Sequence, residues 1–266
     1  MECRLAVRSR FQRAVVVATI VVPLLLALSE RGGRSDQQRE GVLAVLAADA
    51  PPIDAYWFML TDVSVLFVAV VGLLVGYDTF ITERERGTAI LRRTVPVTRG
   101  EVFASMLAVR LATVGVSLCL GALLGAGLVG ATNGAHLFAT MMATAALAAL
   151  VTVVVGAGCW LSVLSRTRRQ ALAAVCLSIG AVVFGTPVLL ESAPSLVFLH
   201  PFYAFTVLAS SPFETVTPIL ETAAGASVTG EGYVVSVGLA GAVLGGWLLV
   251  TLFAAYVQFQ RREWDA

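Results

Sequence analysis

The sequence predicts an all-α integral membrane protein, in which residues 1–266 form a single transmembrane domain with six membrane-spanning helices. Three observations predict this class. Hydrophobic residues make up 58% of the chain and charged residues only 13%, whereas soluble domains have about 45–50% and about 25%. The mean hydropathy is +0.87. The apolar residues also gather in runs of about 20, the length that crosses the hydrocarbon core of a bilayer as a helix.

Each of the six apolar runs is expected to be helical, because a helix satisfies its own backbone polar groups within lipid. The predicted spans cover residues 14–28, 57–77, 102–129, 137–164, 171–190 and 233–259. A β-barrel would show segments of about ten residues with alternating hydrophobicity, and these runs do not alternate. The first run follows a basic start and precedes small residues near Ser29, so a cleaved signal peptide is an open alternative for it.

The arginines predict how the chain is oriented. All 18 basic residues are arginine, and 15 of them lie at the N-terminus, in segment 78–101, at the start of the third span, in loop 165–170 or in the C-terminal tail. Only three lie between the first two spans, and segment 191–232 has none. Because loops on the cytoplasmic side carry the excess of basic residues, we expect a multi-pass plasma-membrane protein with both termini in the cytoplasm.

Residue patterns that carry catalysis or metal binding are absent from the sequence. The chain has no lysine, which a P-loop and a Schiff-base mechanism both require. It has no Cys-x-x-Cys, His-Glu-x-x-His or Gly-x-Ser-x-Gly pattern, and no basic-aromatic pattern typical of nucleic-acid binding. Asp62, Asp78, Arg110 and Glu191 fall near predicted span ends, so no ionic relay is expected at mid-bilayer. We therefore expect no enzyme activity, cofactor, metal site or nucleic-acid partner, and any uphill transport needs an outside energy source.

Segment 78–101, between the second and third spans, carries signals for local structure. Thr82 and Glu85 are spaced as a capping box, which predicts that a short helix begins there. Gly87 loosens or ends this helix. The prediction is a short amphipathic cytoplasmic helix, and the alternative is a solvated charged loop that only sets the topology.

The second half of this segment leads into the third span. Pro96 interrupts the chain. Thr98 and Glu101 form another capping-box pair, which predicts that the helix of the third span begins there. The chain is therefore expected to turn after the short helix and to re-enter the membrane.

The segment also contains an acidic run, then Gly-Thr, then Pro-x-Thr-Arg. The residues concerned are Glu83, Glu85, Gly87, Thr88, Leu91, Pro96, Arg99 and Glu101. This order resembles the loop between the second and third spans of type-2 ABC exporter permeases, the transmembrane subunits of ABC transporters. The Gly-Lys that usually follows in that family is absent, and Ser105 and Met106 stand in its place.

The resemblance implies that segment 78–101 is a coupling helix that docks on a separate cytoplasmic ABC ATPase subunit. Two acidic side chains would contact the ATPase, and neighbouring arginines would hold the helix at the inner headgroups. The residues implied in ATPase coupling are Glu83, Arg84, Glu85, Arg86, Gly87, Thr88, Arg92, Arg93, Pro96 and Arg99.

The function that follows is the permease subunit of an ATP-driven export system, with ATP hydrolysis in the partner subunit. A second permease subunit would complete a homodimer or heterodimer, surrounded by membrane lipid. The alternative is a non-transporting membrane scaffold or assembly factor that recruits a soluble partner through the same segment. A channel or an intramembrane enzyme fits less well, because the spans lack a polar lining and catalytic residues.

Segment 191–232 is apolar, but four prolines interrupt it. Two short helices at the outer interface would satisfy both facts, and permeases of the family carry re-entrant helices before their last span. His200 to Phe205 is similar to a Pro-aromatic segment of the members linked to maturation of copper enzymes. At the other end of the chain, residues 2–13 are expected to form an interfacial helix.

Small residues recur at helical spacing in three of the predicted spans. Such pairs let helix backbones approach closely. The predicted helix-packing residues are Gly72, Gly76, Gly121, Gly125, Gly241 and Gly245. Packing within one bundle and contact between two subunits are both open for these pairs.

Overall fold

The computed structural model describes residues 10–31, 51–85, 98–130, 134–192, 194–197, 199–213 and 236–261. The regular structure in these ranges is helical and contains no strand, which confirms the predicted all-α class for this part of the chain. The helices are α2 (Arg10–Arg31), α4 (Pro52–Glu85), α6 (Arg99–Leu111), the π-helical turn η2 (Ala112–Val116), α7 (Ser117–Val129), α8 (Gly134–Leu164), α9 (Arg168–Ser192), α10 (Pro194–Val197), α11 (Pro201–Ser210) and α13 (Val237–Arg261).

Five stretches of the described helices are long and apolar enough to cross a membrane. They are Arg10–Glu30, Pro52–Ile81, Arg99–Val129, His136–Leu164 and Val237–Arg261. Each contains nearly all of one predicted span, and the multi-pass architecture is therefore confirmed. The remaining predicted span, 171–190, lies on the 25-residue helix α9, and its crossing of the membrane stays a prediction.

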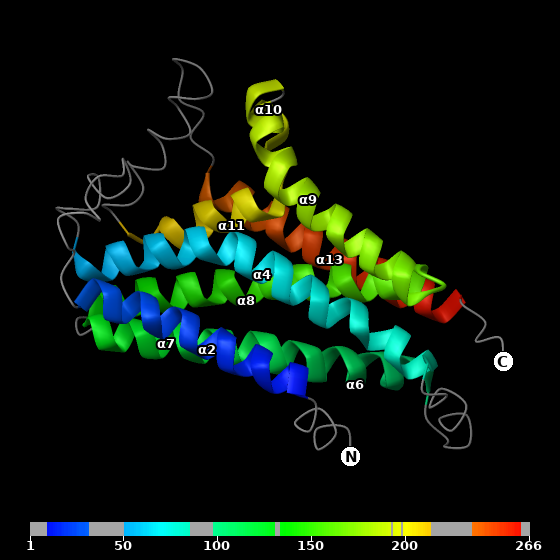
Figure 1. The fold of residues 1–266 in the computed structure, drawn as a ribbon. Coiled ribbons are helices and arrows are strands. Elements are labelled where there is room, and N and C mark those ends of the chain that lie inside the picture. The colour runs from blue at the N-terminus through cyan, green and yellow to red at the C-terminus, as the bar shows by residue number, and fades with distance from the viewer. Residues whose placement is uncertain are drawn as a thin grey trace.

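Helix α8 lies at the centre of the bundle. It packs against α4 and α13, and α11 also lies against it. On the other side of the bundle, α2 runs beside α7 (Figure 1). Helix α9 leaves the bundle at an angle (Figure 1), with Leu177 and Phe184 exposed at 74% and 73%. Exposed apolar side chains of this kind are expected where a helix faces lipid or another subunit.

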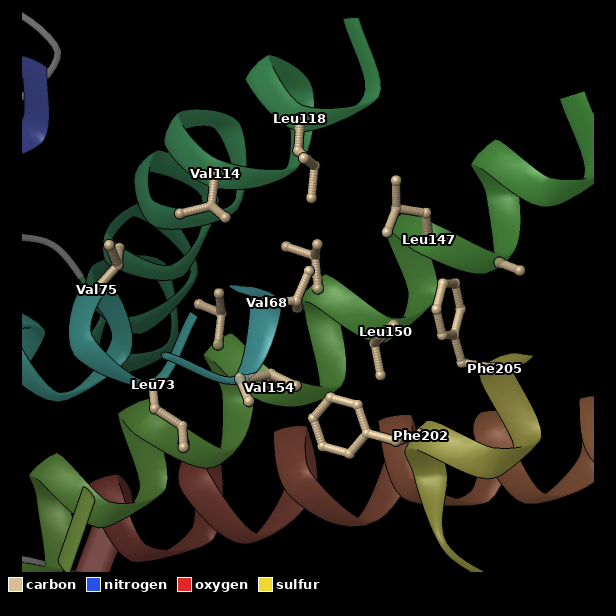
Figure 2. Packing of buried hydrophobic residues seen from close by; sticks show 14 of the residues in the cluster. Val68, Leu73, Val75, Val114, Leu118, Leu147, Leu150, Val154, Phe202 and Phe205 are labelled. Carbon is tan, nitrogen blue, oxygen red and sulfur yellow. The ribbon is translucent and has the colours of Figure 1, made fainter. Parts of the chain in front are cut away.

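The buried core joins helices that are far apart in the sequence. Val68 of α4 and Leu118 of α7 point toward the same region as Leu147 and Leu150 of α8, and Phe205 of α11 closes one side of it (Figure 2). All five side chains are at most 1% exposed. In a membrane, such contacts stabilise the bundle through close packing, because lipid is as apolar as the core.

The third span is one continuous helical path with a change of hydrogen-bond pattern in its middle. Five residues, Ala112–Val116, form the π turn η2 between α6 and α7. The hydroxyl of Ser117 donates to the carbonyl of Thr113, the acceptor that the Ser117 N–H would use in a regular α-helix. That N–H goes to Val114 instead. Single π turns are frequent at functional positions of helices.

Segment 191–232 starts with the last two residues of α9 and then contains the two short helices α10 and α11. Their position at the outer interface stays a prediction, and residues 214–232 lie outside the described part. Helix α11 starts at Pro201 with His200 as its N-cap. The Nδ1 atom of His200 is buried and has no hydrogen-bond partner within the described part of the chain. Next to it, the indole N–H of Trp247 on α13 donates to the carbonyl of Leu199 at 2.7 Å, which attaches the start of α11 to the last helix.

Two local expectations differ from the structure. Helix α4 continues without interruption from Pro52 to Glu85, so no separate helix begins at Thr82. The backbone there is helical on both sides, and its N–H groups therefore need no cap. Of the expected interfacial helix 2–13, residues 10–13 belong to α2, and the rest lies outside the described residues.

Candidate functional site: the ends of segment 78–101

The predicted coupling segment is described at its two ends. The first end is the last part of α4, where Glu83, Arg84 and Glu85 are the final residues of the helix. The second end is the start of α6 at Arg99. The predicted coupling residues between them, Arg86, Gly87, Thr88, Arg92, Arg93 and Pro96, lie outside the described residues.

The start of α6 has the predicted capping box. The backbone N–H of Glu101 donates to the hydroxyl of Thr98 at 3.3 Å, and the backbone N–H of Thr98 donates to the Glu101 carboxylate at 2.8 Å. The Thr98 hydroxyl donates to the same carboxylate at 2.9 Å. The predicted start of the third span is therefore confirmed, and the direction in which α6 leaves the segment is held by local hydrogen bonds.

An aromatic cluster joins α4, α6 and α13 next to both ends of the segment. It consists of Phe80, Phe103, Tyr256 and Phe259. The Phe80 and Phe103 rings stack with centroids 6.0 Å apart, and Phe259 lies 5.1 Å from Phe80 and 5.6 Å from Phe103. Tyr256 meets Phe103 edge-on at 5.7 Å. The three phenylalanines are buried, so the cluster is part of the packed interior at this end of the bundle.

Arg99 connects two of these helices, α6 and α13, through a polar contact. Its Nη1 atom donates to the backbone carbonyl of Gln260 at 3.0 Å. Gln260 lies in the last turn of α13, where helix carbonyls have no partner within the helix and where a positive charge is favourable. The guanidinium of this predicted coupling residue is thus engaged by the last helix of its own chain.

Ionisable groups within the described spans are few. Arg110 of α6 and Asp78 of α4 approach to 4.0 Å, with their side chains 14% and 26% exposed. Asp62 is exposed on α4, ten residues from the start of that helix. Among the described residues, no group of three or more His, Cys, Asp and Glu side chains could hold a metal ion.

The predicted glycine pair of α4 lies against α8. A Cβ atom built on Gly76 would stand 2.6 Å from the carbonyl oxygen of Val155 and 2.8 Å from the Cα atom of Gly158. One built on Gly72 would stand 2.9 Å from a methyl carbon of Val154. At Gly76 the near atoms belong to the backbone of α8, so glycine lets the two backbones touch there, whereas at Gly72 it makes room for the Val154 side chain.

The pair on α7 lies against α2, and the pair on α13 has no such neighbour. A Cβ atom on Gly121 would stand 2.9 Å from the carbonyl oxygen of Thr19, and one on Gly125 would overlap the hydroxyl of Tyr56. No atom of the described residues lies within 4 Å of the positions where Gly241 and Gly245 would carry a Cβ atom. The glycine pairs of α4 and α7 therefore lie against other helices, whereas the pair of α13, which has the same spacing, has no close neighbour among the described residues.

Sequence reasoning did not find the aromatic cluster or η2. A usable signal for the cluster was present, because Phe80, Phe103 and Phe259 each fall at the same predicted end of a span. Their mutual contact could not be derived from spacing, since Phe103 and Phe259 are separated by most of the chain. The π turn has no sequence signal that we recognise in Ala112–Val116.

Comparison with known proteins identifies the family of this chain. A family model for the ABC-2 family transporter protein matches residues 2–264, which is nearly the whole chain. No curated protein matches the chain. The match includes all of the described helices as well as segment 78–101. The chain therefore belongs to the ABC-2 family of transporter proteins.

Proposed function

We propose that this protein is the permease subunit of an ATP-driven ABC export system and that a separate cytoplasmic subunit hydrolyses ATP. The family match over residues 2–264 is the observation that carries the proposal. The chain has no lysine, and a P-loop for ATP requires one. The energy for transport therefore comes from a partner. ATP binding closes the ATPase and shifts the bundle between inward-open and outward-open states.

Segment 78–101 is the site at which the ATPase docks. Its orientation toward the cytoplasm is supported by the 15 arginines on that side of the predicted topology. Glu83 and Glu85 provide negative charge for the ATPase, and the surrounding arginines hold the segment at the anionic inner leaflet. In this arrangement both termini are cytoplasmic and the protein resides in the plasma membrane.

A second permease subunit completes the export route. Support comes from α9, which stands away from the bundle and exposes Leu177 and Phe184. Further support comes from α13, where Gly241 and Gly245 have no close neighbour in the described residues. Either a second copy of this chain or a related chain can cover these faces, and lipid covers the rest.

The alternative function is a membrane scaffold or assembly factor that recruits a soluble protein through segment 78–101. It predicts association with a partner but no effect of the membrane subunit on ATP hydrolysis. An export permease predicts that its presence changes the hydrolysis rate of the ATPase, because the two subunits share one conformational cycle.

Co-purification with the ATPase encoded beside this chain tests the proposal. We expect a stable complex whose ATP hydrolysis differs from that of the isolated ATPase. The double variant Glu83→Gln/Glu85→Gln is expected to weaken the association, whereas Glu191→Gln, at the other end of the predicted topology, is the matched control. Equal association of both variants would count against docking at segment 78–101, and association without any change in hydrolysis would favour the scaffold.

A further inference from the structure

Both ends of segment 78–101 lie close to the last helix of the chain. Phe80 is five residues before the end of α4, and Phe103 is four residues after the start of α6. Both rings contact Phe259 of α13. A displacement of the segment by a docked protein therefore reaches α13 through the packed rings. Closely packed interiors transmit such displacements because they contain few voids.

The polar contact reinforces the apolar one. Arg99 donates to the carbonyl of Gln260, and the capping box of Thr98 and Glu101 fixes the turn from which Arg99 extends. The start of α6 is thus attached to the end of α13 by one charge-assisted hydrogen bond and by two ring contacts of Phe103, with Tyr256 and with Phe259. Charge-assisted bonds are stronger than neutral ones, so α6 and α13 have a firm connection here.

The other half of the third span is attached elsewhere. In α7, the hydroxyl of Ser117 lies 2.7 Å from that of Thr19 on α2, and Gly121 touches the backbone of α2. The π turn η2 separates this half from α6. Both halves of the third span contact α4 and α8, but α6 also lies against α13 and α7 lies against α2. The hydrogen-bond ladder changes register between the two halves.

We propose that the ends of α4, α6 and α13 move as one unit when the ATPase engages segment 78–101, while α7 stays with α2 beyond η2. Phe259 and Arg99 are positioning residues in this unit, because Phe259 packs against Phe103 of α6 and Arg99 donates to the carbonyl of Gln260 on α13. The inference rests on the proposed function and adds the element that receives the movement, which is the last helix.

Distance measurements between spin labels test the inference in the complex of the full chain with its co-purified ATPase. The native cysteines are replaced by alanine, and label pairs are placed at exposed sites. One pair joins Arg13 on α2 to Ser105 on α6, a second joins Arg13 to Arg261 on α13, and a third joins Leu28 on α2 to Gly127 on α7. Addition of ATP and vanadate is expected to change the first two distances together and to leave the third unchanged.

Variants separate the ring contact from general effects on the fold. Phe259→Leu is expected to abolish the change at α13 while the change at α6 remains. Phe253→Leu is the matched control, because Phe253 lies on the same helix, is 70% exposed and is outside the cluster. Arg99→Ala leaves the buried rings intact and is expected to reduce the same change, with partial recovery in Arg99→Lys. Thermal unfolding of each variant checks that it folds.

Three results would overturn the inference. The first is a change in the Arg13–Arg261 distance that is equal in Phe259→Leu and Phe253→Leu. The second is a wild-type complex in which only the Arg13–Ser105 distance changes. The third is a change in the Leu28–Gly127 distance. Failure of the proposed function is distinguishable, because it appears as loss of ATPase association or of the effect on hydrolysis. A complex that hydrolyses ATP without moving α13 contradicts the inference alone.

Discussion

Gly76 of α4 and Gly158 of α8 contact each other through their backbones. A Cβ atom on Gly76 would stand 2.8 Å from the Cα atom of Gly158, and one on Gly158 would stand 2.9 Å from the Cα atom of Gly76. The contact is reciprocal, and the atoms that a new side chain would meet are backbone atoms that cannot rotate away. It holds α4 close to the central helix at the point where α4 approaches segment 78–101.

The Gly76→Ala variant is therefore expected to be less stable. Overpacking a close contact costs about 1–3 kcal/mol, and this contact involves two backbones. Gly127→Ala is the control, because no atom of the residues that the structure describes lies within 4 Å of the Cβ position there. Thermal unfolding in detergent measures the difference, and equal melting temperatures for the two variants would mean that α4 and α8 are not in backbone contact.

The hydroxyl pair of Thr19 and Ser117 is expected to stabilise the contact of α2 with α7. Interhelical hydrogen bonds in membrane proteins average about 0.6 kcal/mol in double-mutant cycles and reach about 1.7 kcal/mol. A cycle of Thr19→Val and Ser117→Ala should give a coupling energy in this range. A cycle of Thr152→Val with Ser117→Ala should give none, because the Thr152 hydroxyl donates within its own helix. A zero value for the first cycle would contradict the contact.

Loss of the capping box is expected to loosen the start of α6. Thr98→Ala removes the acceptor of the Glu101 N–H, and such changes cost about 1 kcal/mol. Hydrogen exchange of the first-turn amides of α6 should accelerate in this variant. Glu101→Gln keeps the reciprocal bond and should exchange nearly as slowly as the wild type. Ser105→Ala is a further control, since that hydroxyl donates to its own helix at Val102.

His200 is expected to make stability depend on pH at the start of α11. Burial lowers the pKa of His200 below its ordinary value. Among the described residues, the buried Nδ1 has no hydrogen-bond partner that would accept a bond from it in the protonated form. The unfolded state binds a proton near pH 6.5, so the unfolded state gains protons first as the pH falls. The contribution of His200 to the stability of the folded protein is therefore fully present above about pH 6.5 and is lost as the pH falls below this value toward the lowered pKa of the folded state.

Melting temperatures in detergent at about pH 7.5 and about pH 5.5 measure this dependence. His200→Asn should have a smaller decrease between the two values than the wild type. His136→Asn is the matched control, because the chain has only two histidines. If the melting temperature of His200→Asn decreases between the two pH values as much as that of His136→Asn, the pH dependence does not come from His200.

The aromatic cluster illustrates what local sequence could not predict. Hydropathy places the start of the third span and the end of the last span to within a few residues of the bounds of α6 and α13, whereas α4 continues to Glu85, beyond the predicted end of the second span at residue 77. It assigns no partner to Phe80 or Phe259, because an apolar residue at a span end can face lipid, another helix or another subunit equally well. Phe253, on the same helix as Phe259, is exposed.

The two capping-box patterns make the same point at short range. Thr98–Glu101 forms the predicted box, since Pro96 lies just before it and the chain has to restart a helix there. Thr82–Glu85 has the same spacing, but α4 continues through it, because no residue between Tyr77 and Glu85 interrupts the helix. A cap forms only where preceding N–H groups lack helical partners.

The sequence by itself determined the membrane class, nearly all of the positions of the helices and the start of the third span, since hydropathy and capping depend on residues that are adjacent in the chain. Only the tertiary structure decided which glycines pack closely against another helix of the subunit: Gly76 does, whereas Gly241 has no close neighbour among the described helices. It also decided that Arg99 and Phe103 contact α13. The physical reason is that close packing depends on which helix lies opposite, and in an apolar environment hydrophobicity alone does not select that neighbour.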